Sequence, residues 1–301
     1  MANNSTKIIL GIFGMMFLMF LTAVIFLIFS FKINKNEISG LEKKKSPIAV
    51  IEINGPIMKS KKTIKLLHEA EKKSKYKAII VRIDSPGGAV GPTQEIFDEI
   101  VRIDKEIPVY ASFGSVAASG GYYIGAAARK IYANRGTITG SIGVIMQFMD
   151  LSELFKLSKV RPEVVKSGEF KDLGNPSRKM RKKERDLLEA SVLKVHEQFR
   201  QDIVSRRGEK IKGSLVELTQ GQIFSGQEAL EQGLVDGLGG LYAVAREIHE
   251  ELKLEGDFRE ITFIKKPKKS KLMNILDQLE EPEALLKKVL LTLDSPVLMF
   301  K

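Results

Sequence analysis

Two serines in a glycine-rich stretch are candidates for a catalytic nucleophile. Ser115 and Ser119 precede the pair Gly120 and Gly121, within residues 108–144, where small side chains predominate. Small residues allow one backbone to approach another closely, and allow a bound chain to approach a nucleophile. A serine in such a turn can attack a carbonyl group if a base removes its proton and nearby donors bind the oxyanion that forms.

The distribution of histidine argues against a serine, histidine and aspartate triad. The chain has three histidines, and none lies between His68 and His196. The pattern places His68 on a surface helix and His196 opposite the apolar stripe of its own helix. A lysine base is the alternative. It requires a lysine whose pKa falls from about 10.4 to near 7 through desolvation, a change of about 5 kcal/mol.

Two lysines stand apart from the charged runs of the chain. Lys166 follows the apolar pair of the segment EVVK, and Lys171 lies between Phe170 and Leu173 in the segment SGEFKDLGNP. The glycines of that segment would allow it to fold over a neighbouring turn. From the residues alone, both lysines are candidate bases.

A scaffold of alternating strands and helices is expected to position these residues. In the first half of the chain, strands are predicted at residues 48–53, 78–84 and 108–113, and helices at 63–74, 93–103 and 124–129. This alternation predicts an α/β fold with parallel strands, right-handed crossovers and helices on both faces of the sheet. Further strands are predicted at residues 130–133, 142–146 and 162–166, and further helices at 177–207, after the N-cap Ser225, and at 241–252. The apolar stripe of the helix at 177–207 predicts core packing.

The composition excludes several classes of protein. Of the 301 residues, 44% are hydrophobic and 28% are charged, which is typical of a globular protein. There is no cysteine, which excludes disulfides, thiol catalysis and cysteine-bound metal. The net charge of +11 lies largely in clusters of lysine and arginine without interleaved aromatic residues. We interpret these clusters as solvated faces or membrane-surface contacts, not as a nucleic-acid site.

An apolar, uncharged stretch at residues 8–31 predicts a transmembrane anchor. As a helix with a rise of about 1.5 Å per residue it would reach roughly 36 Å, enough to cross a bilayer. No A-x-A-like cleavage site follows it, which favours an uncleaved anchor. Along the chain, we expect a cytoplasmic N-terminus at 1–7, the anchor at 8–31, a linker at 32–46, a catalytic domain at 47–264 and a C-terminal extension at 265–301.

Four motifs occur in a characteristic order. They are DSPGG at residues 84–88, AASGGYY at 117–123, TGSIGV at 139–144 and KSGEFKDLGNP at 166–176. In order and spacing the chain resembles the short-form signal peptide peptidases (SppA) of the ClpP/crotonase superfamily, over about residues 48–248. The resemblance implies a ClpP/crotonase-like core of repeated β-β-α or βαβ units around a parallel sheet, preceded by one transmembrane helix.

The resemblance also implies roles for individual residues. It implies that Ser119 is the nucleophile, that Lys171 is the general base and that Ser141 orients the lysine amine. The oxyanion hole would be formed by backbone amides of glycines, namely Gly87 or Gly88 together with Gly120. It implies no cofactor and no metal.

The activity implied by the resemblance is that of a membrane-bound serine endopeptidase with a Ser/Lys dyad, which degrades released signal peptides and similar apolar peptides. It further implies a homo-oligomeric ring or dome, with sites built from neighbouring protomers. The location would be the bacterial inner membrane, with a single span and a periplasmic or otherwise extracytoplasmic catalytic domain. The lysines that follow the anchor point instead to a cytoplasmic body; we give more weight to the order of the motifs.

Alternatives to this function remain. One is a SohB-like or stomatin-associated membrane peptidase with other substrates, and the other is a non-proteolytic scaffold with a crotonase fold. A separate hypothesis concerns the apolar end of the chain at residues 297–300. This end would lie in the peptide groove of its own or a neighbouring protomer, or it would contact the membrane surface or the assembly.

Overall fold

The structure is a computed structural model that describes residues 14–27, 45–265 and 299–300. The chain divides into two compact units, Met1–Lys44 and Lys45–Lys301. In the first unit, residues 14–27 are helical. No helix within the described ranges is both long enough and apolar enough to cross a membrane. The anchor predicted at residues 8–31 extends beyond the described residues on both sides, and the predicted domain boundaries stay predictions.

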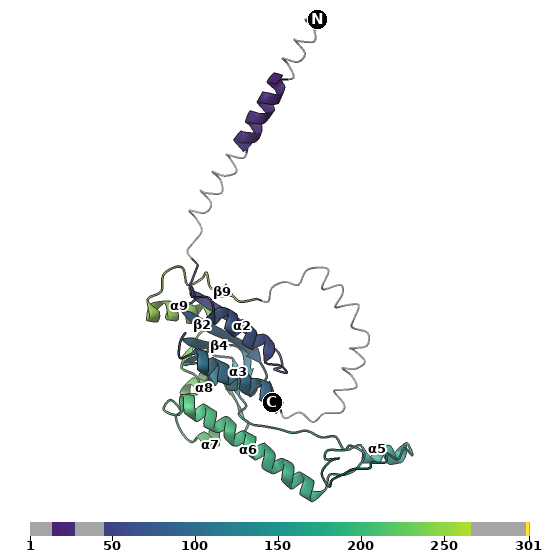
Figure 1. Cartoon of the computed structure of the whole chain (residues 1–301). Coiled ribbons are helices and arrows are strands. Elements are labelled where there is room, and N and C mark those ends of the chain that lie inside the picture. Colours follow the sequence, from purple (N-terminus) through teal and green to yellow (C-terminus); the bar gives the residue numbers. More distant parts are fainter. Residues whose placement is uncertain (1–13, 28–44, 266–298, 301) are drawn as a thin grey trace, which may run out of the picture. The chain divides into compact units, whose positions relative to one another are not determined.

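A mostly parallel sheet of eight strands forms the centre of the second unit (Figure 1). Its main path has the order β7-β6-β4-β2-β1-β9, and β5 pairs with both β4 and β8. The strands are β1 (Ile48–Asn54), β2 (Ala78–Ser85), β4 (Val109–Ala118), β5 (Lys130–Ala133), β6 (Ile138–Gly140), β7 (Ile223–Ser225), β8 (Gly237–Leu238) and β9 (Thr262–Phe263). The pairing of β6 with β7 is antiparallel and the other pairings in this sheet are parallel. The predicted α/β class is confirmed.

Helices cover both faces of the sheet, as the alternation of side chains along β1 shows. Ala49 and Ile51 belong to one buried core and Ile48 and Val50 to another. The first core includes residues of α2 (Lys61–Glu71), α3 (Val90–Ile103), α4 (Gly120–Ala126) and α6 (Lys182–Arg207). The second core includes residues of α9 (Leu241–Leu252). The remaining helices are α5 (Ser152–Leu157), α7 (Leu215–Leu218) and α8 (Gly226–Glu231). Central strands buried on both faces explain the nearly continuous apolar runs in the sequence.

Two strands that the sequence predicts do not form. The strand expected at residues 142–146 is replaced by β6, which ends at Gly140 because Gly140 and Ser141 have φ angles of 77° and 49°. Such angles interrupt an extended backbone. Residues 162–166 form neither strand nor helix, and the side chain of Val165 is fully exposed. Their β-branched composition fits a strand, but no strand in the described part of the chain pairs with them.

An arm, residues 144–181, leaves the sheet and returns to the N-terminal end of α6 (Figure 1). The arm contains α5 and otherwise consists of irregular backbone and turns. The apolar stripe of α6 packs against the core from Val192 onward, and Phe199 and Ile203 are fully buried. Leu187, nearer the arm, is 45% exposed. The prediction that the stripe packs in the core is confirmed from Val192 onward and is wrong for Leu187, next to the arm.

A second, two-stranded sheet joins distant parts of the chain. β3 (Gly88–Ala89) pairs antiparallel with β10 (Met299–Phe300), so that Phe300 lies opposite Gly88. On its other side, Gly88 forms a parallel bridge with Ile57. The C-terminal strand thus extends the backbone layer at the DSPGG motif.

Candidate active site

Ser119 lies at the junction of β4 and α4, at the carboxyl end of a central strand. Its φ of 54° and ψ of −117° fall in a region that residues other than glycine rarely adopt. The N–H of Ser119 donates a hydrogen bond to the carbonyl of Gly140 at 2.8 Å, and its carbonyl accepts one from the N–H of Tyr123 at 2.8 Å. Backbone strain of this kind persists where the surroundings enforce it, and it is concentrated at active sites.

The hydroxyl of Ser119 is buried and has no hydrogen-bond partner within the described residues. Ser119 occupies the N-cap position of α4, but its side chain makes no capping hydrogen bond. A serine that only caps a helix accepts a bond from the second or third N–H of that helix. The alternative of a purely structural cap is therefore not supported. Ser115, the other serine of the motif region, is exposed on β4.

The turn of the DSPGG motif lies directly against the start of α4. A Cβ atom built on Gly120 would lie 3.2 Å from the backbone nitrogen of Gly88 and 3.3 Å from Cα of Gly87. Only a glycine allows this approach without displacing the turn. Two of the predicted oxyanion donors, the amides of Gly88 and Gly120, therefore lie close together beside Ser119.

The register of the sheet places Ser141 next to Ser119. β4 and β6 pair Ala118 with Gly140, and each serine follows its paired residue. The backbone of Ser141 is fixed by a hydrogen bond from its N–H to the carbonyl of Gln222 at 2.7 Å. Because neighbouring strands lie about 4.8 Å apart, the two serines are immediate neighbours at the carboxyl edge of the sheet.

Two buried tyrosines hold α4 in place behind Ser119. The hydroxyl of Tyr122 donates to the carbonyl of Leu234 at 3.0 Å, and the hydroxyl of Tyr123 donates to the carboxylate of Asp202. The ring of Tyr123 lies 4.7 Å from that of Phe97. Burial raises the pKa of Tyr122 to about 12, so this hydroxyl stays a neutral donor. The helix that follows the candidate nucleophile is thus anchored by side chains on two sides.

Lys171 lies in the arm, and its side chain is exposed. Within the described part of the chain, no hydrogen bond or ion pair joins its amine to Ser119 or to any other residue. Figure 1 shows the arm, with α5, beyond the end of α6 and away from the strands. The described chain therefore does not bring the predicted base and the predicted nucleophile together within one protomer.

Lys166, the other candidate base, is engaged inside the arm. Its amine forms an ion pair with Asp172 at 2.5 Å and donates a hydrogen bond to the carbonyl of Glu169 at 3.0 Å. The Lys166 amine is therefore already bound to two groups of the arm. The geometry therefore favours Lys171 over Lys166 as the lysine that is free to meet another group.

The histidines do not contact either candidate serine. His68 pairs with Glu99 at 2.8 Å, and Nε2 of His249 lies 2.8 Å from the hydroxyl of Ser46. Nε2 of His196 is buried without a partner among the described residues. Burial lowers the pKa of His196, and the positive charge of Arg200 lowers it further. In the described ranges, neither Ser115 nor Ser119 has a histidine at hydrogen-bond distance.

One group of side chains has the spacing of a metal site. His68, Glu71 and Glu99 offer ligand atoms within 4.8 Å of one another. Arg102, however, pairs with both carboxylates at 2.7 Å. Because this guanidinium already neutralises the two acids, the group fits a surface ion-pair network better than a metal centre.

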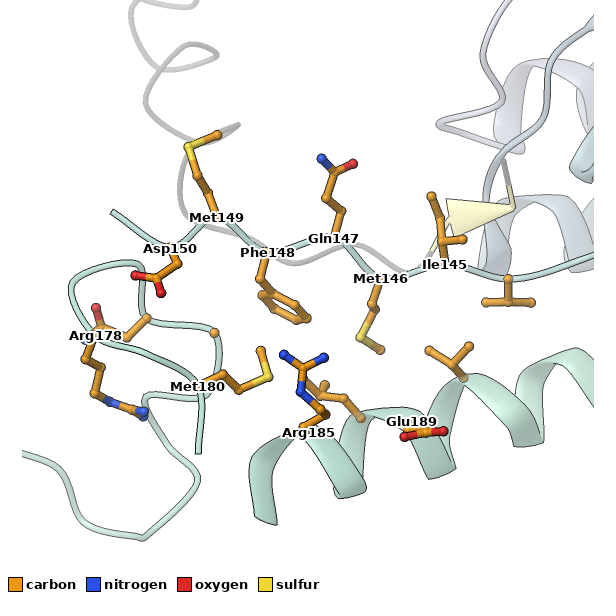
Figure 2. A pocket seen from close by; sticks show the side chains of 15 residues that line it. Ile145, Met146, Gln147, Phe148, Met149, Asp150, Arg178, Met180, Arg185 and Glu189 are labelled. Atoms are coloured by element: carbon orange, nitrogen blue, oxygen red, sulfur yellow. The ribbon is translucent and has the colours of Figure 1, made fainter. Parts of the chain in front are cut away.

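A cavity of about 560 Å³ lies between the arm and the N-terminal half of α6 (Figure 2). Figure 2 shows Met146 and Phe148 pointing toward the helix and Met180 beside them, whereas Gln147 and Met149 point away. Methionine side chains adapt readily to different neighbours. Part of the cavity wall, residues 144–146, has the composition of a strand, so no cavity is predicted there from the sequence.

Comparisons of the sequence with known proteins identify a family. The sequence profile of Peptidase family S49 matches residues 102–255, and that of the Clp protease family matches residues 44–151. The chain belongs to peptidase family S49. The first match contains Ser119, Ser141 and Lys171. The predicted resemblance is thereby confirmed, and the family supports a serine-type peptidase with a ClpP-like α/β fold.

Individual relatives agree with the family match. The protein slr0021 of Synechocystis sp. is 43% identical over 197 residues, which cover 64% of this chain and 69% of that protein. Serine protease SPPA, chloroplastic, of Arabidopsis thaliana is 33% identical over 216 residues, or 67% of this chain and 32% of that protein. Protease 4 of Haemophilus influenzae is 32% identical over 202 residues, or 64% of this chain and 32% of that protein. The chain therefore spans only about a third of the latter two relatives.

Proposed function

We propose that this protein is a serine endopeptidase in which Ser119 is the nucleophile and Lys171 is the general base. The observation that carries the proposal is the hydroxyl of Ser119, which is buried, unpartnered in the described chain and held at a strained turn between strand and helix. A buried hydroxyl without a hydrogen bond costs about 1–3 kcal/mol. An active site can retain such a group because the substrate and the base complete its surroundings.

The proposed reaction proceeds through an acyl-enzyme. The neutral amine of Lys171 takes the proton of Ser119 while Oγ attacks the scissile carbonyl carbon. The amides of Gly88 and Gly120 donate hydrogen bonds to the oxyanion. The Lys171 ammonium then gives its proton to the leaving amine as the C–N bond breaks. In the second half, the same amine activates a water molecule that hydrolyses the ester, which restores Ser119.

The base in this proposal comes from a neighbouring protomer of a homo-oligomeric ring or dome. The arm that carries Lys171 exposes large apolar side chains, among them Leu154, Leu157 and Val165. Such side chains are typical of a protein interface. When the arm covers the Ser119 site of the next protomer, those side chains become buried and the Lys171 amine becomes desolvated, as a neutral lysine base requires.

The proposed substrates are extended apolar peptides, such as the cores of released signal peptides, that add a strand to β3. Support comes from β10, which pairs antiparallel with β3 and places Phe300 opposite Gly88. The edge beside a proposed oxyanion donor is therefore able to accept an extended backbone. Main-chain hydrogen bonds of this kind give affinity, and shallow pockets for alternate side chains give selectivity.

We further propose that residues 8–31 anchor the protein in the bacterial inner membrane, with the catalytic domain outside the cytoplasm. The described helix at residues 14–27 supports an anchor, since Met15, Phe20 and Phe26 each expose more than 60% of their surface. A bilayer would cover these side chains. Attachment of a cytoplasm-specific reporter after Lys301 tests the orientation, and strong reporter activity would contradict it.

The proposed function is tested with an apolar fluorogenic peptide and the full-length protein. Ser119→Ala and Lys171→Ala should each lose activity by roughly 10⁴-fold or more. Ser115→Ala and Lys156→Ala are the matched controls and should retain most of it, since Lys156 is an exposed lysine of the arm that pairs with Glu153 and forms no hydrogen bond or ion pair with residues 166–176 in the described chain. Full activity of either of the first two variants would refute its assigned role, and an inactive wild-type assembly would favour a non-proteolytic scaffold.

A mixing experiment tests the shared site. Ser119→Ala supplies intact lysines and Lys171→Ala supplies intact serines, so a mixed assembly contains some complete sites if each site uses two protomers. Dissociation and reassembly of the two inactive variants together should restore part of the activity. If the mixture is as inactive as its components, although subunit exchange is shown by size or mass, the base comes from the same chain.

A further inference from the structure

We propose that Glu184 is the positioning residue of Lys171, an inference that rests on the role of Lys171 proposed above. Glu184 lies in the first turn of α6, and its side chain is fully buried. Glutamate is almost never fully buried unless it is paired. The partners of this carboxylate lead directly to the loop that carries Lys171, residues 166–176, called here the Lys171 loop.

Two arginines pair with the carboxylate of Glu184. Arg178 donates from Nη1 at 2.9 Å and from Nη2 at 2.7 Å, a bidentate arrangement. Arg181 donates from Nη2 at 2.6 Å and from its backbone N–H at 2.9 Å. These hydrogen bonds, first those from Arg178 and then those from Arg181, hold the pKa of Glu184 well below its ordinary value. The carboxylate is therefore ionised, and both of its oxygens accept hydrogen bonds from the two arginines.

Each arginine also reaches the Lys171 loop. Arg178 donates to the carbonyl of Asp172 at 3.2 Å and to its carboxylate at 3.0 Å. Arg181 donates to the carbonyl of Glu169 at 2.7 Å. The carbonyl groups of Asp172 and Glu169, on either side of Lys171, are therefore hydrogen-bonded to two guanidinium groups. Both guanidinium groups also bind the buried carboxylate of Glu184.

Lys166 contacts the same two residues, Glu169 and Asp172, that the arginines bind. Its amine donates to the carbonyl of Glu169 and pairs with Asp172, as described above. Glu169 also has cationic partners, Arg181 at 3.8 Å and Lys183 at 3.9 Å. Among the charged side chains of the Lys171 loop, that of Lys171 alone has no partner within the described residues. The network therefore fixes the backbone and leaves this one amine available to a neighbouring site.

Position matters more than stability for such a network. A buried ion-pair cluster is often no more stabilising than apolar residues of the same size, but it specifies one geometry. The arm has only one short helix of its own, α5, so its shape depends on these polar contacts. A misplacement of about 1 Å of a reacting group lowers a rate by about 100-fold. Loss of Glu184 should thus act on the chemical step through the position of Lys171.

The test compares Glu184→Gln with Glu153→Gln in the full-length protein. Glu153 is a matched control because it lies in the same arm, is exposed and, among the described residues, pairs only with Lys156, at 2.8 Å, three residues away. We expect Glu184→Gln to lower kcat on the apolar peptide by about 100-fold with little change in KM. The control should match the wild type, and Glu184→Asp should recover part of the loss.

A pH profile separates positioning from a merely structural effect. Activity should rise with pH as the lysine base loses its proton. If Glu184 positions the base, a misplaced amine is less well desolvated in the assembled site, so the rising limb of kcat/KM should move to higher pH in Glu184→Gln. An unchanged kcat and an unchanged pH profile would overturn the inference.

A second variant covers the case in which Glu184→Gln fails to fold or to assemble. Arg178→Lys keeps the positive charge beside Glu184 but loses the planar fork that grips Asp172. It should reproduce the fall in kcat and the displaced pH limb in a folded assembly of wild-type size, and wild-type kinetics in this variant would also overturn the inference. Lys171→Ala separates the two proposals. If that variant is fully active, the proposed base is wrong; if it is inactive while Glu184→Gln is normal, only the positioning role is wrong.

Discussion

Ser119 and Ser141 occupy equivalent positions on two adjacent parallel strands, each one residue beyond the paired residues Ala118 and Gly140. Both serines have positive φ angles, 54° and 49°. The two strands thus end in the same manner, and they present two hydroxyl-bearing residues at one edge of the sheet. The side-by-side placement fits the expectation that one hydroxyl attacks and the other orients the base.

Ser141→Ala should therefore slow catalysis without abolishing it. Loss of one orienting hydrogen bond, worth about 1.4 kcal/mol, corresponds to about a 10-fold fall in kcat. Steady-state kinetics on the apolar peptide give the measurement, with Ser115→Ala as the control. A loss as large as that of Ser119→Ala would mean that Ser141 takes part in bond making itself.

Alanine at Gly120 should impair the oxyanion site. Its Cβ would lie 3.1 Å from Oγ1 of Thr93 and 3.2 Å from the nitrogen of Gly88, so the turn with the proposed donor Gly88 would have to shift by a few tenths of an ångström. Loss of one oxyanion donor typically costs about 100-fold to 1,000-fold in kcat. Gly91→Ala is the matched control, because a Cβ there meets no atom within 4 Å. Equal activity of the two variants would remove Gly120 from the proposed site.

Deletion of residues 265–301 should increase the affinity for peptides. β10 pairs with the β3 edge to which we expect a substrate strand to add. A chain that lacks β10 leaves this edge free, so KM should fall while kcat stays similar. The comparison is made on folded assemblies of equal size. Identical kinetic constants for the truncated and full-length proteins would separate the C-terminal strand from substrate binding.

Acid should destabilise the arm through Glu184. The pKa of this carboxyl is lower in the folded state than its ordinary value of 4.5. Its stabilising contribution is thus complete above about pH 4.5 and is lost as the pH falls toward the lower, folded-state value. The free energy of unfolding of the wild type should fall more steeply below pH 4.5 than that of Glu184→Gln. Parallel curves for the two proteins would contradict this role of the carboxylate.

The central fold was predictable because its signals are local. Strands such as β1 and β2 are buried on both faces, so their sequences are nearly continuous apolar runs. The helices that follow such strands have one apolar face. The N-cap at Ser225 was also predicted and is confirmed by the hydrogen bond that its side chain accepts from the N–H of Glu228. These features depend on residues a few positions apart.

The arm was not predictable in the same way. The segments at 142–146 and 162–166 have the composition of strands, but a strand needs a partner that composition does not supply. Glu184 directly follows a cluster of lysine and arginine, and for such clusters the sequence predicts a solvated face or a membrane-surface contact. Glu184 is in fact fully buried, because Arg178 and Arg181 fold back on it. Burial of that kind depends on how the chain turns before α6.

The sequence by itself determined the α/β class, the serine within the glycine-rich turn and the choice of lysine over histidine as the base to consider. Each of these follows from residue types at short spacing. Only the tertiary structure decided which distant groups meet: Ser119 with Ser141 through strand register, and Gly120 with the DSPGG turn through the docking of α4. It also left Lys171 on an exposed arm. The separation of residues 119 and 171 in space depends on the path of the arm, which no local pattern encodes.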